Sequence, residues 1–214
     1  TPRGVYRDYL ADLQQQLLKD GATIIDLPAN DPRDMARAAT AGASSEMMRP
    51  EGERMAAANV IDGFARITSE GRTSAWAPDP KAALPQWVEL AWPEPRTFNT
   101  VHVTFLTRNN APERFALEVF QAGLWKKVAE VEQNRHRRHV LTFAATTASK
   151  LRLVLLELKA YEQGVCELRV YDEPPRVVEI ARRAARLRDL PDEPPELAWD
   201  DSVMIITGID PKRL

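Results

Sequence analysis

Side chains that could carry catalysis are scattered along this sequence rather than gathered in a motif. Hydrolysis of a glycosidic bond needs two carboxyl groups at one cleft, but the spacing of the available glutamates assembles no such pair: Glu113, Glu118, Glu157 and Glu162. The chain has no Gly-x-Ser-x-Gly, no His-Glu-x-x-His and no phosphate loop. Its nine glycines never occur as Gly-x-Gly, so it contains no dinucleotide-binding loop and no FAD or NAD site. We expect a non-catalytic chain.

One concentrated basic run, Arg135–His139, allows two interpretations. It could grip an anionic sugar, a phosphate or an acidic partner surface. We favour the alternative, a solvated loop between two strands. His136 and His139 have no third metal donor near them in sequence, so they make a poor metal site.

Composition excludes several classes of function. The 214 residues include 29 basic and 31 acidic side chains, a net charge of −2, which offers no excess positive charge for a nucleic acid. The single cysteine excludes an internal disulfide and a thiolate metal cluster. We find no membrane-length apolar run and no signal peptide, so the sequence indicates no cellular location. Because the sequence starts with Thr1 and not with Met, we expect it to be a piece of a longer protein.

Both ends of the chain predict helices. Tyr6, Leu10, Leu13 and Leu17 form one apolar stripe, and Asp31-Pro32 opens a second short helix. After Tyr171, two prolines start another amphipathic helix with Val177, Ile180 and Ala184 along one side, followed by a proline-rich linker and a short strand over residues 202–207.

Between these ends the apolar residues alternate, which predicts strands. The expected strands are Gln86–Trp92, Thr100–Thr107, Arg114–Phe120, a segment from Trp125 to Val131, His139–Phe143, Lys150–Leu156 and Val165–Tyr171. Seven or more short strands separated by turns favour an antiparallel sandwich. Cys166 falls on the inward face of the last strand, where burial should raise its pKa and leave the thiol inert. We therefore expect a helical extension over 1–40, a sandwich over 41–172 and a C-terminal tail over 173–214.

Five short motifs in this region resemble discoidin, or coagulation-factor type C, domains. They are Ala43-Ser44-Ser45-Glu46, Ala57-Ala58-Asn59-Val60-Ile61-Asp62-Gly63, Thr73-Ser74-Ala75-Trp76, Pro85-Gln86-Trp87-Val88-Glu89-Leu90 and Glu167-Leu168-Arg169-Val170-Tyr171. The resemblance implies an eight-stranded, galactose-binding-like jelly-roll sandwich, as in many bacterial carbohydrate-binding modules. The flanking helices resemble the C-terminal region of bacterial FAD-dependent oxidoreductases.

The resemblance also implies a structural Ca²⁺ site. Asp62 matches the Asp-Gly loop of the family and Glu167 its strand carboxylate, while Thr73 or Ser74 would add an oxygen. The alternative is that Asp62 only caps a turn and Glu167 pairs with an arginine. We weigh the two equally.

A glycan site is the second implication of the resemblance, because such modules bind sugars through loops at one end of the sandwich. The plausible contributors are Arg66, Arg72, Trp76, Arg108, Asn109, Asn110, Asn134, Arg135 and His136. The alternative is that these are ordinary loop residues and that Trp76, Trp87 and Trp125 pack in the core.

Two main hypotheses follow. The first is a non-catalytic module that binds a carbohydrate. The second is an accessory or docking domain of a larger FAD-dependent oxidoreductase or other carbohydrate-active enzyme, with no glycan binding of its own. The second predicts exposed apolar stripes on the terminal helices, which would contact a missing catalytic domain or another copy of the chain. A hydrolytic enzyme ranks last.

Overall fold

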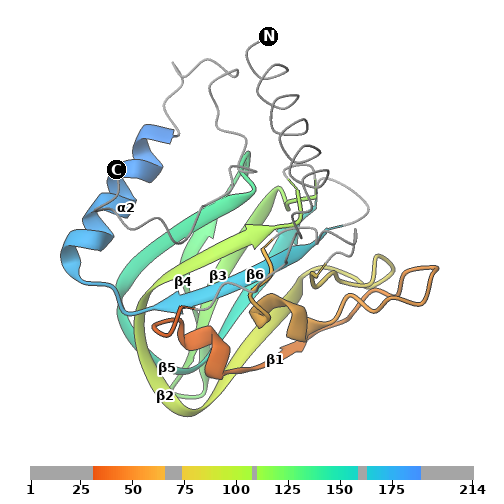
Figure 1. The fold of residues 1–214 in the computed structure, drawn as a ribbon, viewed down its shortest axis with the longest axis horizontal. Helices are drawn as coiled ribbons and strands as arrows, with labels where there is room; N and C mark the ends of the chain where they lie inside the picture. Colours follow the sequence, from red (N-terminus) through yellow and green to blue (C-terminus); the bar gives the residue numbers. More distant parts are fainter. Residues whose placement is uncertain (1–30, 66–73, 108–109, 159–162, 189–214) are drawn as a thin grey trace, which may run out of the picture.

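The computed structural model describes residues 31–65, 74–107, 110–158 and 163–188. Within these residues the protein is mainly β, and its strands pair antiparallel (Figure 1). The strands are β1 (Thr40–Ala43), β2 (Gln86–Phe105), β3 (Arg114–Gln121), β4 (Leu124–Val131), β5 (Arg138–Glu157) and β6 (Val165–Tyr171). Two 3-10 helices, η1 (Met35–Ala38) and η2 (Ala57–Ile61), precede β2, and α2 (Pro175–Arg188) follows β6. The predicted helix at Tyr6–Leu17 and the predicted strand at 202–207 lie outside the described residues.

Two long strands, β2 and β5, belong to both layers of the sandwich. The first half of β2 pairs with β1 and with the second half of β5, which also pairs with β3. The second half of β2 pairs with β6 and with the first half of β5. The register shifts between Ala91 and Arg96, where both strands curve round the lower edge of the molecule in Figure 1. Counted by these halves, the described residues form the expected eight-stranded sandwich, with five segments in one layer and three in the other.

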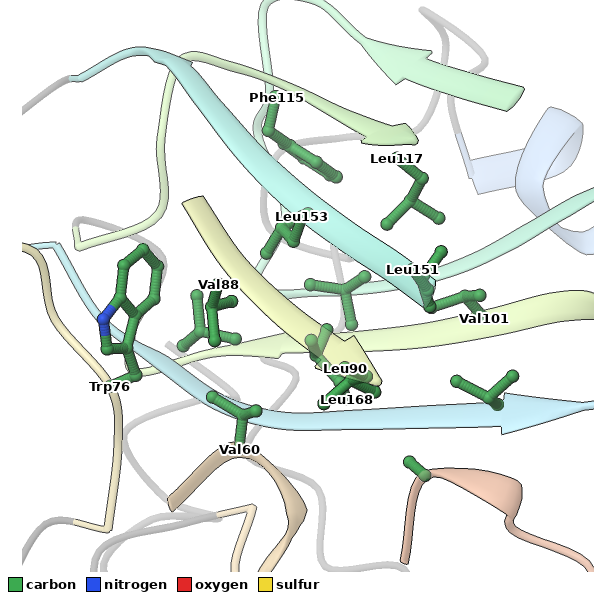
Figure 2. Close-up of a cluster of buried hydrophobic side chains, with 14 of the residues drawn as sticks. Val60, Trp76, Val88, Leu90, Val101, Phe115, Leu117, Leu151, Leu153 and Leu168 are labelled. Carbon is green, nitrogen blue, oxygen red and sulfur yellow. The ribbon is translucent and has the colours of Figure 1, made fainter. Parts of the chain in front are cut away.

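The core lies between the two layers and follows the alternation seen in the sequence. Val88, Leu90 and Leu153 from one layer meet Val101 and Leu168 from the other, and all five side chains are fully buried (Figure 2). The residues between them point to the opposite face of the sheet, where Glu89 of β2 lies opposite Arg152 of β5 in the strand register. This period of two is what a half-buried strand requires.

Two local features fix a strand turn and a helix end. Ala122 (φ 49°) and Gly123 (φ 81°) make the two-residue turn between β3 and β4, where both positive φ values match the right-handed twist of a hairpin. At η1 the side chain of Asp34 accepts hydrogen bonds from the backbone N–H groups of Ala36 and Val170, each within 3.0 Å. The cap is therefore Asp34 rather than Asp31, and it also attaches η1 to β6.

The C-terminal helix α2 begins at the second of the two prolines, as predicted. Val178 packs against the sandwich, while Val177 and Ile180 are 41% and 59% exposed. The tail is joined to β2 by a reciprocal pair of hydrogen bonds between the Asn99 side chain and the Glu173 backbone. No helix among the described residues is long and apolar enough to cross a membrane.

Candidate functional site

Four loops meet at one end of the sandwich, opposite the bend of β2 and β5. Both ends of β2 reach this end, because Gln86 pairs with Leu155 and Thr104 pairs with Arg138. Arg137 joins three of the loops: its Nε donates to the Leu106 carbonyl at 3.0 Å and its Nη2 donates to the Ala65 carbonyl. The backbone of Gly164 bonds with Leu106 and Asn110, which brings in the fourth loop. These contacts join the described parts of the four loops to one another.

Asn134 holds the basic loop in place from below. It is 1% exposed, and its Nδ2 donates to the Pro112 carbonyl at 3.0 Å. Its Oδ1 accepts from the His136 N–H at 2.8 Å and lies 2.9 Å from His139 Nε2. These hydrogen bonds use the Asn134 side chain inside the protein. Its neighbours lie nearer the surface, where Arg135 is exposed and His136 is half-buried.

Trp76 lies in the core rather than on the surface of the loops. Its ring is fully buried beside Val88 (Figure 2), and its Nε1 donates to the Ser45 carbonyl at 2.9 Å. A ring enclosed in this way presents no face to a sugar, which agrees with the packing interpretation of this tryptophan. Trp125 instead lies on the outer face of the sheet, where the Arg152 guanidinium stacks 4.1 Å from its ring centroid.

The structure brings together only some of the residues predicted to bind a glycan. Asn110, Asn134, Arg135 and His136 come from two adjacent loops, and Asn110 is half-buried with its backbone N–H bonded to Thr107 Oγ1. The remaining predicted residues lie outside the described residues: Arg66, Arg72, Arg108 and Asn109. The site is therefore defined here by Asn110, Arg135 and His136.

Three of the four residues predicted to bind calcium also lie together. Ser74 Oγ donates to Asp62 Oδ2, and the Gly63 N–H donates to Glu167 Oε2 at 3.1 Å. Burial raises the pKa of Glu167 to about 8, and the nearby charges of Asp62 and Asp34 add to this effect, whereas Arg169 opposes it. Burial likewise raises the pKa of Asp62. Thr73 lies outside the described residues, and the calcium ion itself stays a prediction.

The glutamates considered for hydrolysis are used for ion pairs on the outer surfaces of the sheets. Arg152 pairs with Glu118 at 2.6 Å, and Arg114 pairs with Glu157 at 3.0 Å. Glu113 contributes its backbone to the Asn134 loop, and Glu162 lies outside the described residues. The carboxylates of Glu118 and Glu157 thus meet cations of the protein rather than each other.

Sequence reasoning did not identify the arginines at the loop end, although one of its alternatives had Glu167 pair with an arginine that it did not name. Arg37 Nη1 donates to the Ile61 carbonyl at 2.6 Å, and Arg169 Nε lies 3.4 Å from Glu167 Oε1. Arg137 was noted only as part of a basic run. Carbonyl acceptors have no residue-type signature, so spacing alone gives no signal for Arg37 or Arg137. For Arg169, its position two residues after Glu167 on one strand face is a usable signal.

The fold is similar to the galactose-binding-like sandwich of solved family 32 carbohydrate-binding modules. A family 32 module of Clostridium perfringens, in complex with GalNAc-β-1,3-galactose, is 23% identical over 64% of this chain and 96% of that chain, with a TM-score of 0.53. Chitosan-binding module 1 from a chitosanase/glucanase of Paenibacillus sp. IK-5 is 23% identical over 64% of this chain and 98% of that chain, with a TM-score of 0.52. The match to SpGH29 spans 67% of this chain but only 28% of that longer chain, at 22% identity and a TM-score of 0.53.

The chain belongs to the family described as domain of unknown function DUF7402, which matches residues 34–171. No curated protein sequence matches it.

Proposed function

We propose that this domain is a non-catalytic carbohydrate-binding module that binds its glycan at the loop end, where the four loops joined by Arg137 and Gly164 meet. The observation that carries the proposal is the loop end itself, in which Arg137 and Asn134 fix the loops while Arg135 stays exposed. The fold shared with modules crystallised with GalNAc-β-1,3-galactose, galactose and chitotriose supports it.

The chemistry of the exposed Arg135 and of the half-buried His136 and Asn110 suits sugar hydroxyl groups. A guanidinium offers several donors in one plane, which matches adjacent hydroxyls on a pyranose ring. The Asn110 side-chain oxygen already accepts from Thr107 Oγ1, so this residue places its amide beside the site with its acceptor engaged. Loops that are already held in place lose less conformational entropy when a ligand binds. Arg135, His136 and Asn110 are therefore the residues we assign to the glycan.

The test is a titration calorimetry panel of galactose, GalNAc, GalNAc-β-1,3-galactose and chitooligosaccharides. We expect one class to bind, and Arg135→Ala to weaken it about tenfold, the equivalent of one lost charge-assisted hydrogen bond. Arg96→Ala is the matched control, because Arg96 is equally exposed but lies at the bend, at the opposite end of the sandwich. Absence of binding across the panel, or equal affinity of the Arg135→Ala protein, would overturn the proposal.

The second candidate is an accessory domain that docks on a larger enzyme through its terminal helices. The exposed Val177 and Ile180 on α2 favour it, and the oxidoreductase-like flanks remain its sequence argument. This alternative predicts no response to any glycan. If the helix face contacts another copy of the chain in place of the enzyme, it also predicts a concentration-dependent self-association in sedimentation velocity that Val177→Ser and Ile180→Ser abolish. Glycan binding by a monomeric protein would reject it.

A further inference from the structure

The loop over residues 61–64 and the Glu167 carboxylate form the place where the family resemblance implies calcium. In this structure their oxygens are already hydrogen-bonded within the protein. Glu167 Oε2 accepts from the Gly63 N–H at 3.1 Å, and Asp62 Oδ1 accepts from the Phe64 N–H at 2.8 Å. Asp62 Oδ2 accepts from Ser74 Oγ.

Two guanidinium groups reach the same loop from different elements. Arg37, on η1, donates from Nη1 to the Ile61 carbonyl at 2.6 Å. Arg169, on β6 and 23% exposed, places Nε 3.4 Å from Glu167 Oε1, and Glu167 itself is only 2% exposed. An ion pair with so little solvent around it is weakly screened, so the positive charge acts at close range on the carboxylate.

The described oxygens at this place (Asp62, Ser74, Glu167 and the Ile61 carbonyl) do not by themselves make up a calcium coordination shell, and Thr73 lies outside the described residues. Ca²⁺ takes six to eight oxygen ligands at roughly 2.3–2.6 Å, whereas here the carboxylate oxygens and the Ile61 carbonyl face N–H and O–H donors. Among the described residues, no group of three or more Asp, Glu, His or Cys side chains is arranged to hold a metal. A divalent ion would also have to displace Arg169 from Glu167 and stand close to a second guanidinium.

We propose that this domain is independent of calcium because Arg37 and Arg169 supply, at the 61–64 loop and Glu167, the positive charge that a bound cation would provide. Arg37 attaches the loop to η1, and Arg169 lies 3.4 Å from the strand carboxyl group that accepts the Gly63 N–H, where its positive charge opposes the effect of burial on the pKa of Glu167. The loop is thereby fixed to the sandwich through protein groups alone. The inference concerns the folded domain and does not depend on whether a glycan binds.

The first test is thermal unfolding of the unmodified protein in EDTA and in 5 mM CaCl₂, with calorimetric titration of CaCl₂. We expect the same Tm in both buffers and no binding heat. A site filled at 100 times its dissociation constant would raise Tm by several degrees. Such a rise, or stoichiometric calcium binding, would overturn the proposal.

The second test asks whether Arg169 acts on Glu167. A double-mutant cycle with Arg169→Gln and Glu167→Gln isolates this pair from the other neighbours of Arg169. We expect Arg169→Gln to lower Tm by several degrees and to cost much less when Glu167→Gln is already present. Arg96→Gln is the matched control, because Arg96 is exposed at the bend, at the opposite end of the sandwich. Strictly additive effects of the two substitutions would overturn the assignment, and if the single variants do not fold, the calcium test on the unmodified protein still decides.

Discussion

Cys166 shows how the sandwich suppresses the reactivity of one side chain. Its thiol is fully buried on β6, and burial raises its pKa to about 11, so almost no thiolate forms at neutral pH. We expect native protein to leave a thiol reagent such as DTNB unreacted, while the same protein in denaturant reacts with one equivalent. Complete labelling of the native protein within minutes would show that β6 opens readily.

His102 should make the stability of the domain depend on pH. Burial, with a contribution from Arg169, lowers its pKa to about 4, and its ring packs 5.0 Å from that of Tyr171. Between pH 6.5 and 4 the unfolded chain binds a proton at this position that the folded chain does not. Stability is therefore lost as the pH falls through this window, by roughly 3 kcal/mol at most.

The measurement for His102 is urea unfolding at pH 7, 6, 5 and 4, with His102→Gln alongside. We expect the difference in unfolding free energy between the two proteins to change in favour of the variant as the pH falls. Comparison within the pair removes the effects of carboxyl groups that both proteins share, Glu167 among them. A difference that stays constant with pH would mean that His102 keeps its ordinary pKa.

At the residue scale, the sequence predicted which residues lie close together better than it predicted their hydrogen-bond partners. The proximity of Asp62, Ser74 and Glu167 followed from the family motifs. Cys166 is buried as predicted, but in a smaller cluster with Met55 and Leu106 and not with Leu168, because the pairing of β6 with β2 shifts register beside it. The positions of Asn134 and Arg137 did not follow from the sequence, because both side chains bond to backbone carbonyls. Such acceptors exist at every residue, so nothing in the sequence indicates which one an arginine or asparagine will reach.

At the scale of elements, the alternation of apolar residues predicted seven strand segments in the right places. The structure joins four of them into the two long strands β2 and β5. The segments ending at Trp92 and beginning at Thr100 are continuous in β2 even though Pro93 and Pro95 lie between them. These prolines are tolerated because residues 93–97 are exposed at the bend, where the register shifts and no inner ladder is interrupted. The short strand β1 was missed, since Thr40–Ala43 contains no large apolar residue.

The attachment of the C-terminal tail depends chiefly on Asn99. Its Nδ2 donates to the Glu173 carbonyl at 2.8 Å, and its Oδ1 accepts from the Glu173 N–H at 2.9 Å. We expect Asn99→Ala to lose about 1–3 kcal/mol in urea unfolding, because two backbone groups of the partly buried Glu173 lose their partner. Arg96→Ala, three residues away and exposed, should change the free energy of unfolding by less than about 0.5 kcal/mol. Equal effects of the two substitutions would show that the tail is not held by this pair.

At the scale of the whole molecule, the sandwich contains the main hydrophobic core, and α2 packs against its outside. The main core cluster draws its buried residues from the strands, η1, η2 and adjoining loops, and it contains no residue of α2. The described contacts of α2 with the sandwich are modest: Val178 is buried, and Arg182 donates to Thr142 Oγ1 at 3.0 Å in an exposed position. An open groove of about 670 Å³, lined by Phe143 and Val178 among others, separates the helix from the strands.

Because the core is complete without α2, a chain that ends at Pro174 should fold. It keeps the Asn99–Glu173 pair, and of the described contacts of α2 it loses the Val178 packing and the Arg182–Thr142 bond, so we expect one cooperative unfolding transition with a Tm lowered by a few degrees. Leu153→Ala in the full chain supplies the contrast, since removing a fully buried side chain from between the layers should cost about 2–5 kcal/mol. Glycan affinity at the loop end should be unchanged in the shortened chain, because Arg135 and Asn134 contact no part of α2 in the described contacts. Loss of the cooperative transition would place α2 within the folding unit, and loss of glycan binding alone would move the site from the loop end to the helix.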